Sequence, residues 1–207
     1  EKTFHILVIE DNSPDGTADI VRRLQNEFPE RLFMIERKGK LGLGTAYITG
    51  FKWSIEKGYD YIFEMDADFS HNPNDLPRLY KACHEEGADV SIGSRYVSGV
   101  NVVNWPMGRV LMSYFASKYV RFITGLPIHD TTAGFVCYRR KVLETIHLDH
   151  IRFKGYAFQI EMKFTAFKCG FHITEVPVIF INRELGTSKM NSSILGEAVF
   201  GVIQLKW

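Results

Sequence analysis

The sequence lacks the features that mark secreted, membrane-spanning and nucleic-acid-binding proteins. Its three cysteines are widely spaced and form no C-x-x-C pair, which argues against a disulfide framework and favours reduced thiols in the cytoplasm. No apolar run reaches the roughly 18–20 residues that cross a bilayer, and no signal-peptide pattern is present. The net charge is only +1, so no field of one sign points to nucleic acid as the partner.

The chain does have an ordinary share of apolar residues, 45% of 207, which is enough for the core of one α/β domain. Strand patterns alternate with helical ones, which predicts a mostly parallel sheet flanked by helices, with a smaller antiparallel portion in the C-terminal half. Strands are expected at 4–9, 31–36, 59–65, 90–95, 135–139 and 172–181. Helices are expected after the first strand and at about 45–57, 75–86, 107–123 and 156–168.

The most informative motif is Asp66-Ala67-Asp68, which follows an aromatic and apolar strand and precedes a run of turn formers. Side chains two residues apart on an extended chain point the same way, so two carboxylates should lie together at the carboxyl end of a strand. Ligands bind at that edge of open α/β sheets. Two adjacent anions repel unless a cation lies between them. The motif therefore predicts a divalent metal that holds a phosphate ligand, with a solvated acidic loop as the alternative.

Other strand ends should contribute to the same cleft. Asp11 ends the first strand and could accept from a nucleobase or a ribose hydroxyl, and an Asx-turn cap explains it equally well. Asp15 and Gly16 fit plain turn geometry better than a ligand site. Arg95 follows the strand at 90–95, with equal weight for the cleft and the surface. The turn Gly39–Gly44 either offers backbone N–H groups to an anion or simply reverses the chain.

The expected helix at 107–123 is apolar around much of its girth but carries a polar stripe. The stripe has a spacing of four and consists of Arg109, Ser113, Ser117 and Arg121. Such a helix either lies against lipid while the stripe holds an anionic headgroup, or packs in the core with the stripe facing water. Further on, Arg183 and Lys189 flank a small, flexible centre that could close over a diphosphate; a solvated basic loop is the alternative.

Together these motifs resemble the inverting family 2 glycosyltransferases, and within them the dolichol-phosphate or polyprenol-phosphate mannosyltransferases. The resemblance rests on Ile9–Thr17, Gly42–Gly44, Asp66–Pro73, Gly93–Tyr96, Asn104-Trp105 with Arg109 and Ser113, Asp130–Phe135, and Arg183 with Lys189. It implies a GT-A fold in a single catalytic domain over 1–207, with a nucleotide-sugar half at 1–97 and an acceptor half at 98–207. The family's first βα unit is expected to be absent from this sequence before Phe4. The chain starts on Glu1 and ends on Trp207 after an apolar stretch, as expected for a piece of a longer protein, so a membrane segment beyond Trp207 stays open.

The resemblance assigns the donor and its metal to the first half of the chain. Ile9 and Asp11 would contact the nucleobase region, and Asp66 and Ala67 would hold the nucleotide. Asp68, together with Asp66, would bind Mg²⁺ or Mn²⁺.

The remaining roles are assigned to basic and hydroxyl side chains. Arg95, Arg183 and Lys189 would contact the phosphates or the sugar of the donor. Arg109 and Ser113 would meet the lipid phosphate, in agreement with the polar stripe. A polyprenyl phosphate is already anionic at neutral pH, so it needs positioning more than deprotonation.

The implied activity is metal-dependent transfer of a sugar, with GDP-mannose favoured as donor, to a polyprenyl (dolichyl) phosphate with inversion. The expected place is the cytoplasmic face of a membrane. One alternative is an enzyme of the same fold that uses UDP-glucose, another donor or a glycan acceptor. A second is a nucleotide-binding scaffold without turnover, and a nucleotidyltransferase is a further possibility.

Overall fold

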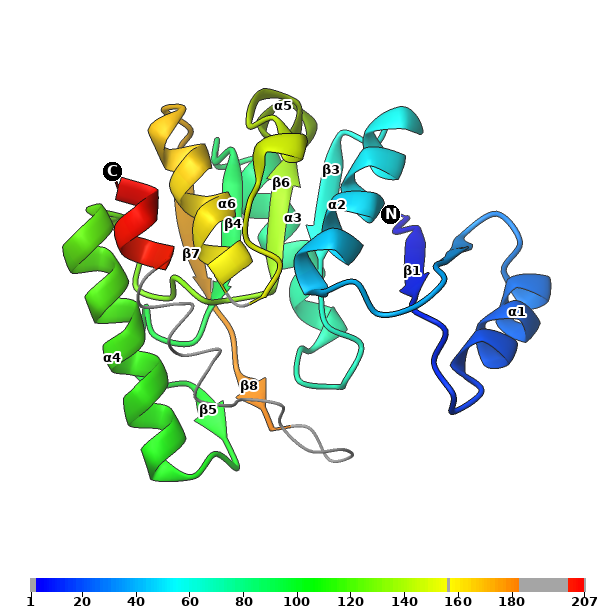
Figure 1. Ribbon diagram of the computed structural model, residues 1–207, viewed down its shortest axis with the longest axis horizontal. Coiled ribbons are helices and arrows are strands. Elements are labelled where there is room, and N and C mark those ends of the chain that lie inside the picture. Colours follow the sequence, from blue (N-terminus) through cyan, green and yellow to red (C-terminus); the bar gives the residue numbers. More distant parts are fainter. Residues whose placement is uncertain (1–2, 156, 183–200, 207) are drawn as a thin grey trace.

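The computed structural model describes residues 3–155, 157–182 and 201–206. In the first half the elements are β1 (Ile6–Glu10), α1 (Thr17–Glu27), β2 (Leu32–Glu36), α2 (Leu43–Glu56), β3 (Tyr61–Glu64), a short 3₁₀ turn (Pro73–Asp75), α3 (Leu76–His84) and β4 (Val90–Ser94). In the second half they are β5 (Val102–Val103), α4 (Met107–Thr124), β6 (Val136–Arg139), α5 (Arg140–Thr145), a 3₁₀ turn (Leu148–His150), α6 (Ala157–Lys168), β7 (Ile173–Pro177) and β8 (Phe180–Ile181). The predicted alternation of strands and helices is confirmed (Figure 1).

The strands form three hydrogen-bonded ladders. The largest has the order β3-β6-β4-β7, in which β6 is antiparallel to both neighbours and β4 is parallel to β7. β1 pairs in parallel with β2, and β5 pairs in parallel with β8. The antiparallel strand therefore lies in the C-terminal half, as predicted. The strand expected at 172–181 is divided into β7 and β8, because Pro177 has no N–H to continue a ladder and ends β7 at the sheet edge.

Two apolar clusters hold the sheet between its helices. The larger joins the large ladder to helices α2, α4, α5 and α6, with Phe51, Tyr138 and Phe158 almost fully buried. The smaller joins the ladder to α3 through Leu79, Cys83 and other buried residues. A fully buried large apolar side chain contributes roughly 1.5–3 kcal/mol, so these clusters are the main source of stability for the strand ends that follow.

Helix α1 is less buried than its sequence pattern predicts. Of the apolar face formed by Ile20, Val21, Leu24 and Phe28, only Val21 is buried. The reason is geometric: α1 covers the β1–β2 ladder, whose two strands are about 4.8 Å apart, whereas a helix is about 10 Å wide. Among the described residues no ladder joins β1 to β3, and α2 packs against both strands. Figure 1 shows α1 and α4 at opposite ends of the molecule.

Candidate functional site

The acidic motif lies in a bend just after β3, since the strand ends at Glu64, two residues before Asp66. Tyr47 of α2 donates its hydroxyl hydrogen to Oδ1 of Asp66 at 2.8 Å. Oδ1 of Asp68 accepts the backbone N–H of Ser70 at 3.1 Å and also the Ser70 hydroxyl. The chain turns between Asp68 and Ser70 at Phe69, whose φ of 61° lies in the left-handed region. Both aspartates are half-buried and held by neighbours, so the solvated acidic loop is a poor description of them.

The oxygen donors of Asp66 and Asp68 fit a divalent ion. Mg²⁺ and Mn²⁺ prefer carboxylate oxygens, and Mg²⁺ commonly takes one or two carboxylates together with substrate phosphates. In the described part of the chain, no group of three or more His, Cys, Asp or Glu side chains is arranged to hold a metal by itself. The two aspartates therefore suit an ion whose coordination is completed by a phosphate ligand.

Asp11 is held by an arginine that the sequence interpretation missed. Arg37 Nε lies 2.6 Å from Asp11 Oδ1, Arg37 Nη2 lies 2.7 Å from Asp11 Oδ2, and Arg37 Nη1 donates to the Thr45 hydroxyl at 2.9 Å. The register explains the pair, because Glu10 faces Glu36 in the parallel β1–β2 ladder and the next two residues are Asp11 and Arg37. The rule that located Asp11, a charged residue directly after a strand, would have located Arg37 as well.

The turn after β1 is capped by Glu10, and the alternative of an Asx-turn cap at Asp11 is not observed. The buried Glu10 carboxylate accepts the N–H groups of Asn12 at 2.8 Å and Ser13 at 2.7 Å. Hydrogen bonding by Ser13 lowers the pKa of Glu10 below its ordinary value. Asp15 accepts the N–H and hydroxyl of Thr17, which is the plain turn geometry that was favoured. Ile9 is half-buried in β1 below this turn.

Arg95, at the end of β4, is a buried ion-pair partner. Its Nε and Nη2 lie 2.6 Å from the two carboxylate oxygens of Asp130, and Nη2 also donates to the Thr132 hydroxyl at 2.9 Å. Burial acts to raise the pKa of Asp130, but attraction to Arg95 and its hydrogen bonds outweigh burial and lower that pKa. Arg95 is thus buried against Asp130 and is not a surface residue. Its contact with the donor remains a prediction.

The indole of Trp105 stands between the two arginines assigned to different substrates. The guanidinium carbon of Arg109 lies 4.0 Å from the Trp105 ring centroid, and that of Arg95 lies 5.5 Å away. Phe180 of β8 packs edge-on against the same indole at 5.2 Å. These cation–π contacts bring to one indole ring the two arginines that the resemblance assigned to donor and acceptor.

Three residues of the α4 stripe, Arg109, Ser113 and Ser117, lie on the side toward the protein, and several apolar residues of the helix face outward; Arg121 is half-buried beside Lys118 and Phe122. Arg109 Nη1 donates to Asn182 Oδ1 at 3.0 Å, and Thr131 donates to the buried Ser117 hydroxyl at 3.4 Å. On the outside, exposure reaches 71% at Met107, 60% at Phe115 and 86% at Phe122, with Leu111 and Met112 also exposed. A stripe that faces water is therefore wrong at Arg109, Ser113 and Ser117, while Val120 of the same helix packs in the core.

Arg183 and Lys189 lie outside the described residues. The preceding strand is described: Ile181 N–H donates to Ser70 O at 3.2 Å, and Asn182 N–H donates to Val103 O at 3.0 Å. β8 therefore runs between the Asp68–Ser70 bend and β5, and its end reaches Arg109 through Asn182.

The glycine turn before α2 serves packing. Gly42 has a left-handed φ of 103°, and a Cβ at Gly44 would lie only 2.7 Å from the Phe158 ring. The Gly44 N–H donates to the Lys154 carbonyl at 2.9 Å, so it is already used by the chain. These contacts favour the plain turn over an anion site.

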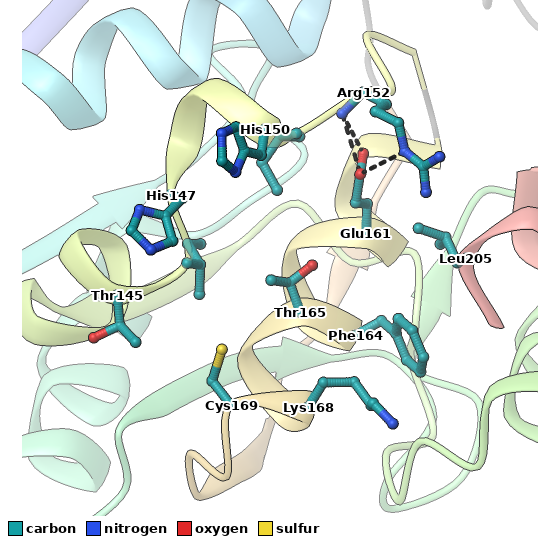
Figure 2. Close-up of a pocket in the computed structure, with 12 residues that line it drawn as sticks. Thr145, His147, His150, Arg152, Glu161, Phe164, Thr165, Lys168, Cys169 and Leu205 are labelled. Atoms are coloured by element: carbon teal, nitrogen blue, oxygen red, sulfur yellow. Dashed lines mark hydrogen bonds and ion pairs between the residues drawn. The ribbon is translucent and has the colours of Figure 1, made fainter. Parts of the chain in front are cut away.

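The cavity drawn in Figure 2 is a separate feature. It has a volume of about 390 Å³ and lies between α5, α6 and the C-terminal residues 201–206. Glu161 on its wall accepts the backbone N–H groups of Arg152 and Phe153. Among the described residues, none that the sequence assigned to a substrate or metal lines this cavity.

Comparison with known proteins places the chain in a family. The family model "Glycosyl transferase family 2" matches residues 1–147. The chain is 48% identical over 200 residues to the polyprenol monophosphomannose synthase of Mycolicibacterium smegmatis, covering 97% of the chain and 75% of that protein. It is also 48% identical over 197 residues to the undecaprenyl-phosphate mannosyltransferase of Micrococcus luteus, covering 95% and 80%.

Solved structures support the same fold. The glucosyl-3-phosphoglycerate synthase of Mycobacterium tuberculosis, in complex with Mn²⁺, UDP and glucosyl-3-phosphoglycerate, has a TM-score of 0.62 at 18% identity, covering 97% of the chain and 67% of that structure. A mannosyltransferase from Pyrobaculum calidifontis, in complex with GDP-Man and Mn²⁺, has a TM-score of 0.57 at 18% identity, covering 89% and 49%. The chain has the GT-A fold and belongs to the family 2 glycosyltransferases.

Proposed function

We propose that this chain transfers mannose from GDP-mannose to a polyprenyl phosphate, with inversion, in a metal-dependent reaction at the cytoplasmic face of a membrane. The observation that carries the proposal is the 48% identity, over 97% of the chain, to a polyprenol monophosphomannose synthase. The Micrococcus luteus relative, an undecaprenyl-phosphate mannosyltransferase, supports the same donor sugar and acceptor class.

On the donor side, Asp66 and Asp68 hold Mg²⁺ or Mn²⁺ together with the donor diphosphate, and Ala67 lies against the nucleotide. The bound ion supplies positive charge that neutralises the departing nucleoside diphosphate. Tyr47 orients Asp66, and Ser70 orients Asp68, through the hydrogen bonds described above.

The base and phosphates of the donor meet the other strand ends. Ile9 and Asp11 border the nucleobase, and the pairing with Arg37 fixes the direction of the Asp11 carboxylate. Arg95 supports the phosphate side of the site, and Arg183 and Lys189 add positive charge there as the sugar–phosphate bond breaks.

The acceptor half positions the nucleophile without a catalytic base. A polyprenyl phosphate carries negative charge at neutral pH, so Arg109 and Ser113 orient its phosphate oxygen toward the sugar. Asn182 and the Trp105 ring hold Arg109 in place from two sides. The outward face of α4, with Phe115 and Phe122 beside the basic Lys118 and Arg121, rests on the anionic membrane surface.

No helix in the described residues is long and apolar enough to cross a membrane. The proposed association through α4 is therefore a surface contact of the described domain.

The test is incubation of the protein with polyprenyl phosphate vesicles and each of a panel of labelled GDP- and UDP-sugars, with Mn²⁺, with Mg²⁺ or with a chelator. Label from GDP-mannose should enter the organic phase only when a metal is present. Organic-phase label from a UDP-sugar alone would replace the donor assignment, and nucleotide binding without any transfer would favour the scaffold. Asp149→Asn, an exposed partner of Lys52, serves as the matched control for aspartate variants.

A further inference from the structure

Lys163 is a fully buried lysine whose role the proposed mechanism has not used. It lies in α6 with a relative exposure of 0%, although lysine is almost never fully buried unless it is paired. Its ammonium donates to the Ala133 carbonyl at 2.6 Å, to the Gln159 carbonyl at 3.0 Å and to Gln159 Oε1 at 3.1 Å. Three donors therefore meet three acceptors, and this saturation makes the burial tolerable.

Lys163 is buried near a second ionisable group, Glu64. Burial lowers the pKa of Lys163 to about 8, while attraction to the buried Glu64 opposes that shift. Glu64 is the last residue of β3, and its carboxylate accepts the Tyr138 hydroxyl at 3.3 Å. An apolar residue at position 163 would avoid the desolvation cost of burying an ammonium, so the lysine carries a penalty that its hydrogen bonds offset.

The residue that Lys163 anchors lies between two contacts of the donor half. On one side of Ala133, Thr132 accepts from Arg95. On the other side, a Cβ at Gly134 would lie 4.0 Å from Asp66 Oδ2 and 3.6 Å from the Gln159 amide nitrogen. The bond from Lys163 to the Ala133 carbonyl therefore lies at the centre of a segment that contacts Arg95 and passes close to Asp66.

We propose that Lys163 is a positioning residue of the donor half: by holding the Ala133 carbonyl it fixes segment 130–135 and, through that segment, the placement of Arg95 and the wall beside Asp66. This inference rests on the proposed function, because the segment matters through its effect on the nucleotide-sugar. Lys163 itself touches neither the donor nor the metal.

The test is Lys163→Met, which keeps the length of the side chain and removes its donors. The same change at Lys168 is the matched control, since that lysine lies on the same helix and lines the separate cavity of Figure 2. Titration calorimetry with GDP and Mn²⁺ reads donor-site affinity directly, and steady-state assays read the KM for GDP-mannose and for polyprenyl phosphate separately. Thermal unfolding of each variant measures the loss of stability alone.

Lys163→Met should weaken GDP–Mn²⁺ binding and raise the KM for GDP-mannose by about 10-fold, since a buried carbonyl loses its partner, with an unchanged KM for polyprenyl phosphate. Lys168→Met should match the wild type in GDP–Mn²⁺ affinity and in the KM for each of the two substrates. A folded Lys163→Met protein that binds GDP–Mn²⁺ within about 2-fold of wild type would overturn the inference, because a purely structural lysine changes only the melting temperature.

A second pair of variants covers the case in which Lys163→Met does not fold because the buried Glu64 loses the attraction of Lys163. Glu64→Gln and Glu64→Gln/Lys163→Met differ only in the lysine, and the same fall of about 10-fold in GDP–Mn²⁺ affinity is expected between them. Equal affinity would overturn the inference. Binding of GDP–Mn²⁺ by a wild type that transfers no mannose would refute the proposed function and leave this comparison intact.

Discussion

The charged groups at the strand ends are covered by partners within the chain, whereas the outer side of helix α4 is left exposed. The two regions meet at Trp105, whose ring contacts both Arg95 and Arg109. At the strand ends the charges are paired within the chain: Asp11 with Arg37, and Arg95 with Asp130. Helix α4 turns Arg109 and Ser117 toward Asn182 and Thr131 and leaves Phe115 and Phe122 exposed on its outer side. The strand ends that are proposed to bind the donor are thus held by contacts within the chain, whereas the outer face of α4 is an exposed apolar patch, which is typical of a surface that binds a partner or a membrane.

The largest effect that would test this comparison is expected at the metal. Asp68→Ala removes a carboxylate that is proposed to hold the ion, so the rate of mannosyl transfer should fall on the order of 10³-fold or more. The measurement is the initial rate of label transfer from GDP-mannose as a function of Mn²⁺ concentration. Turnover at wild-type rate with the usual metal dependence would refute the assignment, and Asp149→Asn supplies the control.

The second effect tests the preformed ion pair through stability. Asp130→Asn removes the buried carboxylate that is paired with Arg95 and should cost about 3–5 kcal/mol in the free energy of unfolding. The exposed pair of Lys52 and Asp149 is the contrast, since Asp149→Asn should cost only about 0–1 kcal/mol. Urea unfolding at neutral pH measures both.

The pH dependence of stability in acid should show the contribution of the Arg95–Asp130 ion pair. The pKa of Asp130 is lowered in the folded state, so its contribution is fully present above the unfolded pKa of about 3.9. That contribution is lost as the pH falls from there through the lowered folded pKa, because the unfolded chain then binds more protons. As the pH falls through this range, the free energy of unfolding, measured with urea, should decrease more steeply for the wild type than for Asp130→Asn. If the two plots of this free energy against pH are parallel, the Arg95–Asp130 pair does not control stability in acid.

The strand ends were predictable because local sequence defines them, and their partners were not. A buried strand followed by turn formers locates Asp66 and Asp68, and the same local rule would have given Arg37 after β2. The pairing of Arg95 with Asp130 joins residues 35 apart and depends on how the loop before β6 folds back. The burial of Lys163 could not be predicted, because nothing in the local sequence of α6 indicates that its neighbours are buried.

The orientation of α4 could not be predicted from its stripe alone. A stripe of Arg109, Ser113, Ser117 and Arg121 faces water or protein with equal ease until its partners are known. Those partners, Asn182 and Thr131, lie on distant segments that only the fold brings to the helix. The sequence therefore defined the amphipathic helix, and tertiary contacts decided which side is outside.

The third effect separates the two halves kinetically. Arg109→Ala should raise the KM for polyprenyl phosphate by about 10–100-fold, because a charge-assisted contact with the phosphate is lost, with little change in the KM for GDP-mannose. Arg140→Ala, which removes an exposed arginine paired with Asp60, is the control. Equal losses for donor and acceptor would mean that the Trp105 stack transmits the damage and that the halves are not independent.

The smallest effect concerns the outer face of α4 alone. Replacing Phe115 and Phe122 by serine removes apolar area that is proposed to enter the lipid interface, so binding to vesicles of anionic phospholipid should fall about 10-fold. Cosedimentation measures this binding, and calorimetry with GDP and Mn²⁺ should give wild-type affinity, since neither phenylalanine contacts the strand ends.

Helix α1 provides the matched control for that last prediction, because it also exposes large apolar residues but lies at the opposite end of the molecule. Ile20→Ser/Phe28→Ser removes a comparable apolar surface and should leave vesicle binding unchanged. If both double variants weaken vesicle binding equally, general hydrophobicity explains the association and α4 has no special face. If only the α4 variant does, added salt should weaken wild-type binding further, because Lys118 and Arg121 each contribute about 1 kcal/mol of screened attraction to anionic lipid.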